Sequence, residues 1–374
     1  MINLDISKEE FKTHIAGRKF KFFPKSHSAR ISWTEVDQTL FSWDPSDKFL
    51  KVVKGGENFT HKVVESFQDI GRIRTRLVKD LLYAELADGA TLLLNRLDLK
   101  NQTVNELTFS LGQFYGERAI SNGYVSFGEE RAFNKHWDTH DVFAVQLAGR
   151  KHWKVFEPTF KDPLVHQKSK PFINDCPPTP AFERILEAGD ILYIPKGWWH
   201  EVLPVDGEPT FHIAVGIHAS RVRDYLCWLC STKLDQYSEF RLALNNAVDQ
   251  VPDESAVIAQ LNALLADPQN IKEFNREIRN SERTNSSFQL ERLALKKDVG
   301  KSFSSDETLK FNSVYPMHVV GQKSAVNGFN VEFDQRSFDA VQGVIESRRM
   351  SGHEDSNLIT KLLQADVLSI RRSM

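Results

Sequence analysis

The 374-residue chain has little of several features that define common protein classes. Its three cysteines are too few for the disulfide framework of a small secreted domain. No uncharged apolar run approaches the roughly 18 residues that a membrane span needs, and the first residues lack the basic and apolar regions of a signal peptide. These absences predict a reduced, cytoplasmic protein that does not span a membrane.

Charge of one sign is also lacking. The chain carries 48 Lys and Arg against 50 Asp and Glu, so no surplus of positive charge draws it to a phosphate backbone. Within residues 301–374, nine Lys and Arg balance nine Asp and Glu. Nucleic acid is therefore not expected as the main partner.

Aromatic residues, in contrast, are abundant: 26 Phe, 7 Trp and 7 Tyr. Together with 41% hydrophobic and 26% charged residues, they are typical of a globular chain with a well-filled interior. At about 150 residues per domain, the length indicates two or three domains. None of these numbers identifies a chemistry.

Local patterns predict a mainly β core with helical flanks. Ser7 and Glu10 form a capping-box pattern for a helix that ends before Gly17, and a second helix is expected across 104–114. From about 120 to 218, short β-rich runs alternate with turn signals, which favours a sandwich or barrel.

The hydrophobic pattern becomes helical across 221–265. We expect its buried positions at Leu226, Leu229, Leu234, Phe240, Leu242, Leu244 and Val248. Cys227 and Cys230 form a lone Cys-x-x-Cys pair in this segment. Without a second ligand pair or a βαβ context, they are interpreted as two small residues on a helix.

The chemistry-bearing pattern begins at His136-Trp-Asp138. On a strand, residues i and i+2 lie on the same face, so we expect His136 and Asp138 to point together into the barrel from a strand that continues through Gln146. Much later, a Gly-Asp turn, a short apolar run and a Pro-x-Gly turn precede His200. This arrangement predicts His200 on a neighbouring strand.

Two imidazoles and one carboxylate on one face of a metal form the facial triad of non-heme Fe(II) oxygenases. The remaining coordination positions are open to a 2-oxo acid and O₂. His140 also falls on the even-numbered face, but four strand residues span about 13 Å. We therefore expect His140 at the mouth of the site or in contact with substrate.

Three motifs together resemble the JmjC-type cupin oxygenases, in the group that contains the ribosomal oxygenases, which are protein hydroxylases. They are His136-x-Asp138, then Asp-Val-Phe-x-x-Gln146-x-x-Gly149-x-Lys151-x-Trp153, and finally Gly189-Asp-x-Leu-Tyr-x-Pro195-x-Gly-x-x-His200. The specific motifs cover about 120–218, and the flanking layout is similar over most of the chain.

The resemblance implies a double-stranded β-helix (cupin or jelly roll) that binds Fe(II) and 2-oxoglutarate. It implies a catalytic domain at 1–220, a helical segment at 221–300 that forms a homodimer, and a winged-helix-like domain at 301–374. The implied iron ligands are His136, Asp138 and His200.

The resemblance also implies a binding site for the cosubstrate. Lys151 matches the basic residue that pairs with the distal carboxylate of 2-oxoglutarate, and a lysine on the inner face of a barrel is costly without an anionic partner. The alternative is that His152 faces inward instead. Asn122 and Tyr124 match residues that contact the cosubstrate, although Asn122-Gly123 is also compatible with a turn.

Other candidates carry less specific signals. His212 is either close behind the metal ligands or a satisfied core histidine. Trp137 and His140 occupy positions that vary in the family, and Trp198 and Trp199 make the segment before His200 bulky. These residues are expected to shape the substrate mouth, with packing beneath the barrel as the alternative for Trp198 and Trp199.

The sequence thus predicts a 2-oxoglutarate-dependent hydroxylase that acts on a side chain of a protein or peptide. Demethylation of N-methyl-lysine by the same chemistry is a second enzymatic hypothesis. A non-catalytic cupin that serves as a regulatory or binding protein is the third.

Overall fold

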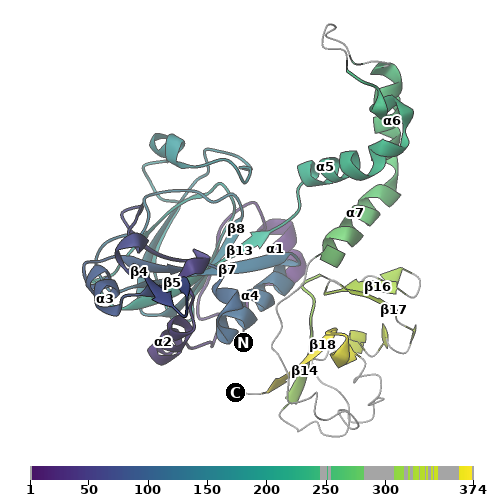
Figure 1. Ribbon diagram of the computed structural model, residues 1–374. Coiled ribbons are helices and arrows are strands. Elements are labelled where there is room, and N and C mark those ends of the chain that lie inside the picture. The colour runs from purple at the N-terminus through teal and green to yellow at the C-terminus, as the bar shows by residue number, and fades with distance from the viewer. Residues whose placement is uncertain are drawn as a thin grey trace. The chain divides into compact units, whose positions relative to one another are not determined.

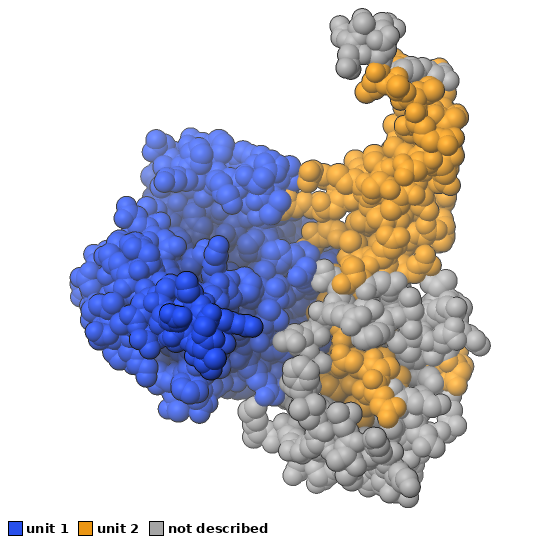
Figure 2. Space-filling model, viewed as in Figure 1, with its two compact units in different colours: residues 1–218 blue, residues 219–374 orange. Residues whose placement is uncertain are grey.

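The computed structural model describes residues 2–244, 251, 254–281, 307–315, 319–320, 323–327, 329–332, 334–335, 338–339, 341–343 and 362–372. The chain divides into two compact units, Met1–His218 (unit 1) and Ala219–Met374 (unit 2), which Figure 2 colours separately. No helix within the described residues is long and apolar enough to cross a membrane.

The helices of unit 1 begin and end where their capping residues require. The side chains of Ser7, Ser32 and Asn101 each accept a hydrogen bond from a backbone N–H of the first turn. Gly116 ends the longest helix in a left-handed conformation, with φ +87°. The helices are α1 (Lys8–His14), α2 (Trp33–Phe41), α3 (Lys79–Ala87) and α4 (Gln102–Tyr115), with 3₁₀ turns at Pro45–Asp47, Thr60–Lys62, Leu97–Leu99 and Lys170–Asp175.

Unit 1 is built on antiparallel sheets. The largest has eight strands in the order β1-β11-β8-β13-β7-β6-β2-β3, and Figure 1 shows its members β7, β8 and β13 side by side. Its strands are β1 (Lys21–Phe23), β2 (Leu50–Lys54), β3 (Glu57–Asn58), β6 (Thr91–Leu94), β7 (Arg118–Ser126), β8 (Asp141–Ala148), β11 (Ile191–Ile194) and β13 (Thr210–His218).

A second sheet of three strands has the order β10-β9-β12, and a separate hairpin pairs β4 with β5. Their bounds are β4 (Val64–Asp69), β5 (Arg72–Leu77), β9 (Arg150–Phe156), β10 (Phe182–Glu187) and β12 (Trp199–Leu203). In β9, Lys151, Trp153 and Val155 are buried, whereas the residues between them are partly exposed. The mainly β core with helical flanks is confirmed.

The predicted strand from His136 to Gln146 is wrong at its start. The ladder strand β8 begins at Asp141, and His136 belongs only to an isolated bridge with His200. The chain bends after this bridge, because the carbonyl of Asp138 accepts a hydrogen bond from Gly197 N (2.9 Å) in a turn rather than from a strand. The two-residue period of a strand therefore does not explain how His136 and Asp138 come together.

Unit 2 contains helices followed by short strands in its described parts. The helices are α5 (Val222–Lys233), α6 (Glu254–Ala266) and α7 (Pro268–Ser281), with 3₁₀ turns at Leu234–Gln236 and Ser238–Arg241. The strands β14 (Glu307–Phe311) and β18 (Leu368–Arg372) form one sheet, and β15 (Val319–Val320), β16 (Lys323–Val326) and β17 (Phe329–Glu332) form another.

The helical period in unit 2 identified helices but not all of their buried residues. Leu229, a residue of α5, is buried as expected, and Leu234 and Phe240 are half-buried. Leu226, Leu242 and Leu244 are 39%, 49% and 68% exposed, so their predicted burial within the chain is wrong. Val248 lies outside the described residues. Cys227 and Cys230 lie exposed on α5.

Candidate metal centre

Backbone hydrogen bonds bring the two histidine-bearing segments together. His136 N donates to the carbonyl of His200 (3.1 Å), and His200 N donates to the carbonyl of His136 (2.8 Å). The pair of bonds fixes the two residues directly opposite each other. Residues 64 positions apart in the sequence thereby become neighbours.

The side chains of His136, Asp138 and His200 converge. One donor atom from each lies within 4.8 Å of the others, and no other group of three or more His, Cys, Asp or Glu converges in this way among the described residues. Nδ1 of His136 lies 2.8 Å from the carbonyl of Asn134, and Nδ1 of His200 lies 3.2 Å from that of Trp198. Protons on both Nδ1 atoms leave the Nε2 lone pairs free, which is how metal-bound histidines are usually oriented.

The electrostatics of the cluster suit a cation. Burial lowers the pKa of His200, which keeps its imidazole neutral and able to coordinate. Burial alone would raise the pKa of Asp138, but the neighbouring His200, His136 and His140 outweigh it and lower the pKa. The cluster therefore presents a neutral imidazole at His200 and a carboxylate at Asp138.

Lys151 is buried deep in the same unit. Its side chain points inward with Trp153, and its Nζ donates to the hydroxyl of Ser126 (2.8 Å). None of the ion pairs among the described residues includes Lys151. Burial lowers its pKa to about 8. The alternative with His152 inward is wrong, since His152 pairs with Glu183 (2.9 Å) on the other face.

Aromatic rings surround this lysine and the histidines. Tyr124 and His212 stack almost parallel, with centroids 4.7 Å apart, and Trp153 meets the edge of His212 at 5.5 Å. His212 is buried, its Nδ1 has no hydrogen-bond partner, and burial together with the charge of Lys151 lowers its pKa to about 3. The ring of Trp153 also lies 6.3 Å from that of His200.

Asn122 and His140 lie at the edges of this region. Asn122 is inside β7, so the alternative of a turn is wrong, and its Oδ1 accepts a hydrogen bond from Arg96 N (3.1 Å). His140 stacks on His218 (4.8 Å) and lies against Gly216, where a Cβ would come within 2.6 Å of the His140 ring. His140 is thus held beside the cluster.

The three tryptophans expected at the substrate mouth are all buried. Trp137 is buried against Phe160 (5.3 Å), with Trp199 at 6.3 Å. Trp198 is buried in a separate cluster and meets the edge of Phe20 at 5.6 Å. Packing, the alternative for Trp198 and Trp199, is what the structure has, and the expected place of Trp137 at the mouth is wrong. The stretch between β9 and β10 covers Trp137, whereas Trp198 packs among strand residues such as Trp153.

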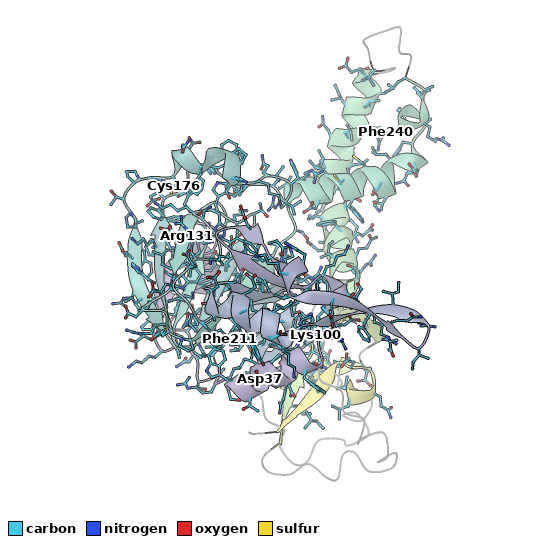
Figure 3. The ribbon with its side chains drawn as sticks, turned by 60° about the vertical axis from the view of Figure 1, so that its left-hand side comes forward. Asp37, Lys100, Arg131, Cys176, Phe211 and Phe240 are labelled. Atoms are coloured by element: carbon cyan, nitrogen blue, oxygen red, sulfur yellow. The ribbon has the colours of Figure 1, made fainter. Side chains whose placement is uncertain are left out.

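Three further residues were missed by the sequence analysis. Ser126, the partner of Lys151, shares a strand face with Tyr124, and this two-residue spacing is a signal that could have found it. Phe133 meets the edge of His136 at 5.9 Å from a loop without a pattern. Arg131, marked in Figure 3, pairs with the buried Glu201 (2.7 Å), next to His200 in the sequence.

Comparison with known proteins adds independent information. Residues 96–225 match the family model of the JmjC domain. Ribosomal oxygenase 1 of Danio rerio is 34% identical over 116 residues, 31% of this chain and 21% of that protein. The bifunctional lysine-specific demethylase and histidyl-hydroxylase NO66 of Aedes aegypti is 30% identical over 126 residues, 33% of this chain and 19% of that protein. The chain thus matches less than a quarter of the length of these two relatives.

A crystal structure of Escherichia coli YcfD has the same fold. It superposes with a TM-score of 0.59 over 99% of this chain and 100% of that one, at 16% identity. A structure of YcfD, described as a ribosomal oxygenase in complex with cobalt and 2-oxoglutarate, gives a TM-score of 0.57 at 16% identity over the same shares of the two chains.

The JmjC match contains the whole His136, Asp138 and His200 cluster as well as Lys151. The sequence matches, the shared fold and the His–Asp–His geometry agree. The chain therefore contains a JmjC domain at residues 96–225, and it is similar in sequence to ribosomal oxygenase 1 and in fold to YcfD.

Proposed function

We propose that this protein is an Fe(II)- and 2-oxoglutarate-dependent oxygenase that hydroxylates a side chain of a protein or peptide. The observation that carries the proposal is the convergence of His136, Asp138 and His200 within 4.8 Å inside a JmjC domain. The complex of YcfD with cobalt and 2-oxoglutarate supports the same pair of ligands.

The three side chains fit Fe(II). Two imidazoles and one carboxylate are the donor set of the facial triad, which leaves positions open for other ligands. His200 is buried, whereas the side chain of Asp138 is 34% exposed. Solvent therefore reaches the cluster at Asp138 rather than at His200.

The surroundings of Lys151 fit the cosubstrate. Its buried ammonium has a hydroxyl partner but no carboxylate in the described structure, and an unpaired buried charge is unfavourable. The C5 carboxylate of 2-oxoglutarate would complete the pair with a charge-assisted hydrogen bond. Tyr124 and Asn122, which share a strand face with Ser126, would contact the same molecule.

Bound iron, with 2-oxoglutarate as reductant and O₂ as oxidant, supplies the chemistry that converts a C–H bond into C–OH while 2-oxoglutarate yields succinate and CO₂. The chain does the rest. His136, Asp138 and His200 hold the metal, Lys151 orients the cosubstrate, and the rings of Trp153, Tyr124 and His212 exclude water.

The substrate proposal rests on the relatives. Ribosomal oxygenase 1 and the bifunctional NO66 protein have names that describe action on proteins, and one of them names histidine as a target. The name of the NO66 protein also includes lysine demethylation, which makes removal of an N-methyl group from lysine the second candidate activity. A non-catalytic cupin would bind neither iron nor 2-oxoglutarate.

The test is a search for the product. Iron-loaded protein is incubated with a cell extract and 2-oxoglutarate, and peptides are compared by mass spectrometry with those from the His136→Ala variant. A protein peptide heavier by one oxygen, formed only by the wild type, supports hydroxylation. Loss of a methyl group from lysine would favour demethylation, and no change in either would contradict the proposal.

For unit 2 we propose that the helices of 221–300 form a homodimer and that 301–374 is a winged-helix-like domain, with the catalytic domain at 1–220. Apolar side chains exposed on and around α5 and α6 support dimerisation: Val222, Leu226, Leu242, Leu244, Ile258 and Leu265. We propose a cytoplasmic location from composition alone.

A further inference from the structure

A buried carboxylate lies close in sequence to the candidate metal ligands without belonging to their cluster. Asp141 begins β8, three residues after Asp138, and is 5% exposed. No ion pair within the described residues involves it. Burying a carboxylate without a cation raises the free energy of folding unless hydrogen-bond donors satisfy it. The donors to Asp141 therefore identify the segments that this side chain connects.

Three donors reach this carboxylate. Its Oδ1 accepts from the backbone N–H of Lys196 (3.0 Å), and its Oδ2 accepts from the hydroxyls of Tyr115 (2.7 Å) and Tyr193. The Tyr193 hydroxyl in turn accepts from Gly17 N (2.8 Å), at the end of the first helix. Asp141 is therefore fully hydrogen-bonded and rigidly held.

The bond to Lys196 extends a set of rungs between the two ligand-bearing segments. His136 and His200 exchange two backbone hydrogen bonds, and Asp138 O accepts from Gly197 N. Next to these, Asp141 Oδ1 accepts from Lys196 N. The first three bonds join backbone atoms, so substituting a side chain does not remove them. The bond to Lys196 N is accepted by the Asp141 side chain, so a substitution of Asp141 removes it.

These hydrogen bonds join the two segments that carry the candidate metal ligands. The Pro195–Trp198 turn leads directly into His200, while Asp138 and His136 lie on the opposite segment. A shift of the turn by a fraction of an ångström would move His200 relative to His136 and Asp138, and donor distances of a metal site tolerate only about 0.2 Å.

We infer that Asp141 is a positioning residue that sets the separation between His200 and the His136/Asp138 pair by holding the Lys196 backbone. The inference rests on the proposed metal function. A carboxylate that only stabilised the core would change the folding stability and leave the metal affinity as it is.

The matched control is Asp190, another buried carboxylate bonded to backbone N–H groups. Its Oδ1 accepts from Lys25 N (2.9 Å) and its Oδ2 from Glu187 N (3.0 Å), at the far end of β11 from the Pro195 turn. Removing it should cost stability in the same way without touching the ligand segments.

The experiment measures the dissociation constant for Co²⁺, as a redox-stable probe, together with the melting temperature of the full chain. We expect Asp141→Ala to weaken Co²⁺ binding by about tenfold or more, the range found when supporting groups of metal ligands are lost. Asp141→Asn keeps one acceptor for Lys196 N and should recover most of the Co²⁺ affinity. If the alanine variant does not fold, the asparagine variant replaces it in the measurement. Asp190→Ala should lower the melting temperature with an unchanged Co²⁺ affinity.

Equal Co²⁺ affinities for wild type, Asp141→Ala and Asp141→Asn would overturn the inference while leaving the proposed function intact. A wild type that binds no Co²⁺ would overturn both. Amide hydrogen exchange in the metal-free chain tests the positioning role independently of the proposed metal function. Asp141→Ala should speed exchange at Lys196 and Gly197 more than Asp190→Ala does. Unchanged exchange there would show that the rung positions nothing.

Discussion

The two units differ in the polar side chains that their described residues bury. The interior of unit 1 buries ionisable side chains, among them Lys151, His200 and Asp141. The buried polar residues in the described part of unit 2 are uncharged, such as Asn270, and this part leaves large apolar side chains in solvent, such as Val222 in α5 and Leu244. Neither arrangement is favourable for an isolated chain, because buried charge and clustered exposed apolar surface both raise the free energy.

The difference teaches what kind of partner each unit is suited to. Buried nitrogens and an unpaired ammonium are satisfied by small charged ligands, here a metal ion and a dicarboxylate. Exposed leucines and valines are covered by another polypeptide surface, for which we have proposed a second copy of the chain. The first region would be completed by electrostatics and the second by the hydrophobic effect.

The largest expected effect comes from breaking the polar region at the metal. His136→Ala or Asp138→Ala should reduce 2-oxoglutarate-dependent succinate formation by more than about 100-fold, because loss of a ligand costs more than loss of a supporting group. His152→Ala, a surface histidine paired with Glu183, is the control and should retain full activity. Substantial activity in Asp138→Ala would exclude the proposed ligand set.

Next in size is the loss of the buried ammonium. Lys151→Met keeps the length of the side chain and removes its charge, so 2-oxoglutarate binding should weaken by about 10- to 100-fold, the value of a charge-assisted hydrogen bond. The ligand-free variant should also melt at a higher temperature, because it no longer buries an ionisable group. Calorimetric titration and thermal unfolding measure the two effects, and an unchanged affinity would remove Lys151 from the cosubstrate site.

The pH dependence of 2-oxoglutarate binding tests the role of the Lys151 ammonium in a second way. Burial lowers the pKa of Lys151 to about 8, so the free site loses its charge as the pH rises through that value. A bound carboxylate needs the protonated amine, so affinity for 2-oxoglutarate should be highest below pH 8 and fall about tenfold from about pH 7 to 9. Lys151→Met should bind weakly with a flat profile over that range. A wild-type affinity for 2-oxoglutarate that rises with pH would contradict the predicted decrease.

In unit 2, an exposed and a buried leucine should respond differently. Leu244→Lys should raise the dissociation constant of self-association about tenfold, or 1.4 kcal/mol, and leave the unfolding temperature of the monomer unchanged. Leu229→Ala, at a position that is 1% exposed, should lower the free energy of unfolding by about 2–5 kcal/mol. Sedimentation equilibrium and thermal unfolding separate the two. A monomeric wild type would refute the proposed dimer.

The smallest effect is expected at an exposed apolar residue of unit 1 that belongs to no cluster we have identified. Ile70 is 96% exposed at the tip of the β4–β5 hairpin, with φ +46°, a left-handed conformation that a β-branched residue adopts at a cost. Ile70→Asn should raise the free energy of unfolding by about 1 kcal/mol and leave self-association unchanged. A weaker self-association in this variant would show that isolated exposed residues also take part.

The β core and the approach of His136, Asp138 and His200 could be predicted from the sequence, but one reason given for that approach was wrong. A strand period was assumed for His136 and Asp138, whereas an isolated bridge and a turn bring them together. Such contacts leave no repeating pattern. Lys151 was oriented correctly because it lies within a regular strand, where alternation does apply.

Long-range packing could not be predicted. The burial of Trp137 depends on Phe160 and on Phe172, both supplied by the stretch between β9 and β10. The helical period across 221–265 likewise marked Leu244 as apolar without showing that the chain itself leaves it uncovered. A period identifies a face of an element, but the partner of that face is decided by tertiary or quaternary structure.

The central claim is that one site holds both metal and 2-oxoglutarate. Its most direct test is an anaerobic calorimetric titration of 2-oxoglutarate into the Fe(II)-loaded chain. We predict a single class of sites that requires the metal, is lost in Asp138→Ala and is strongly weakened in Lys151→Met. Binding of equal strength without metal, or in Asp138→Ala, would contradict it.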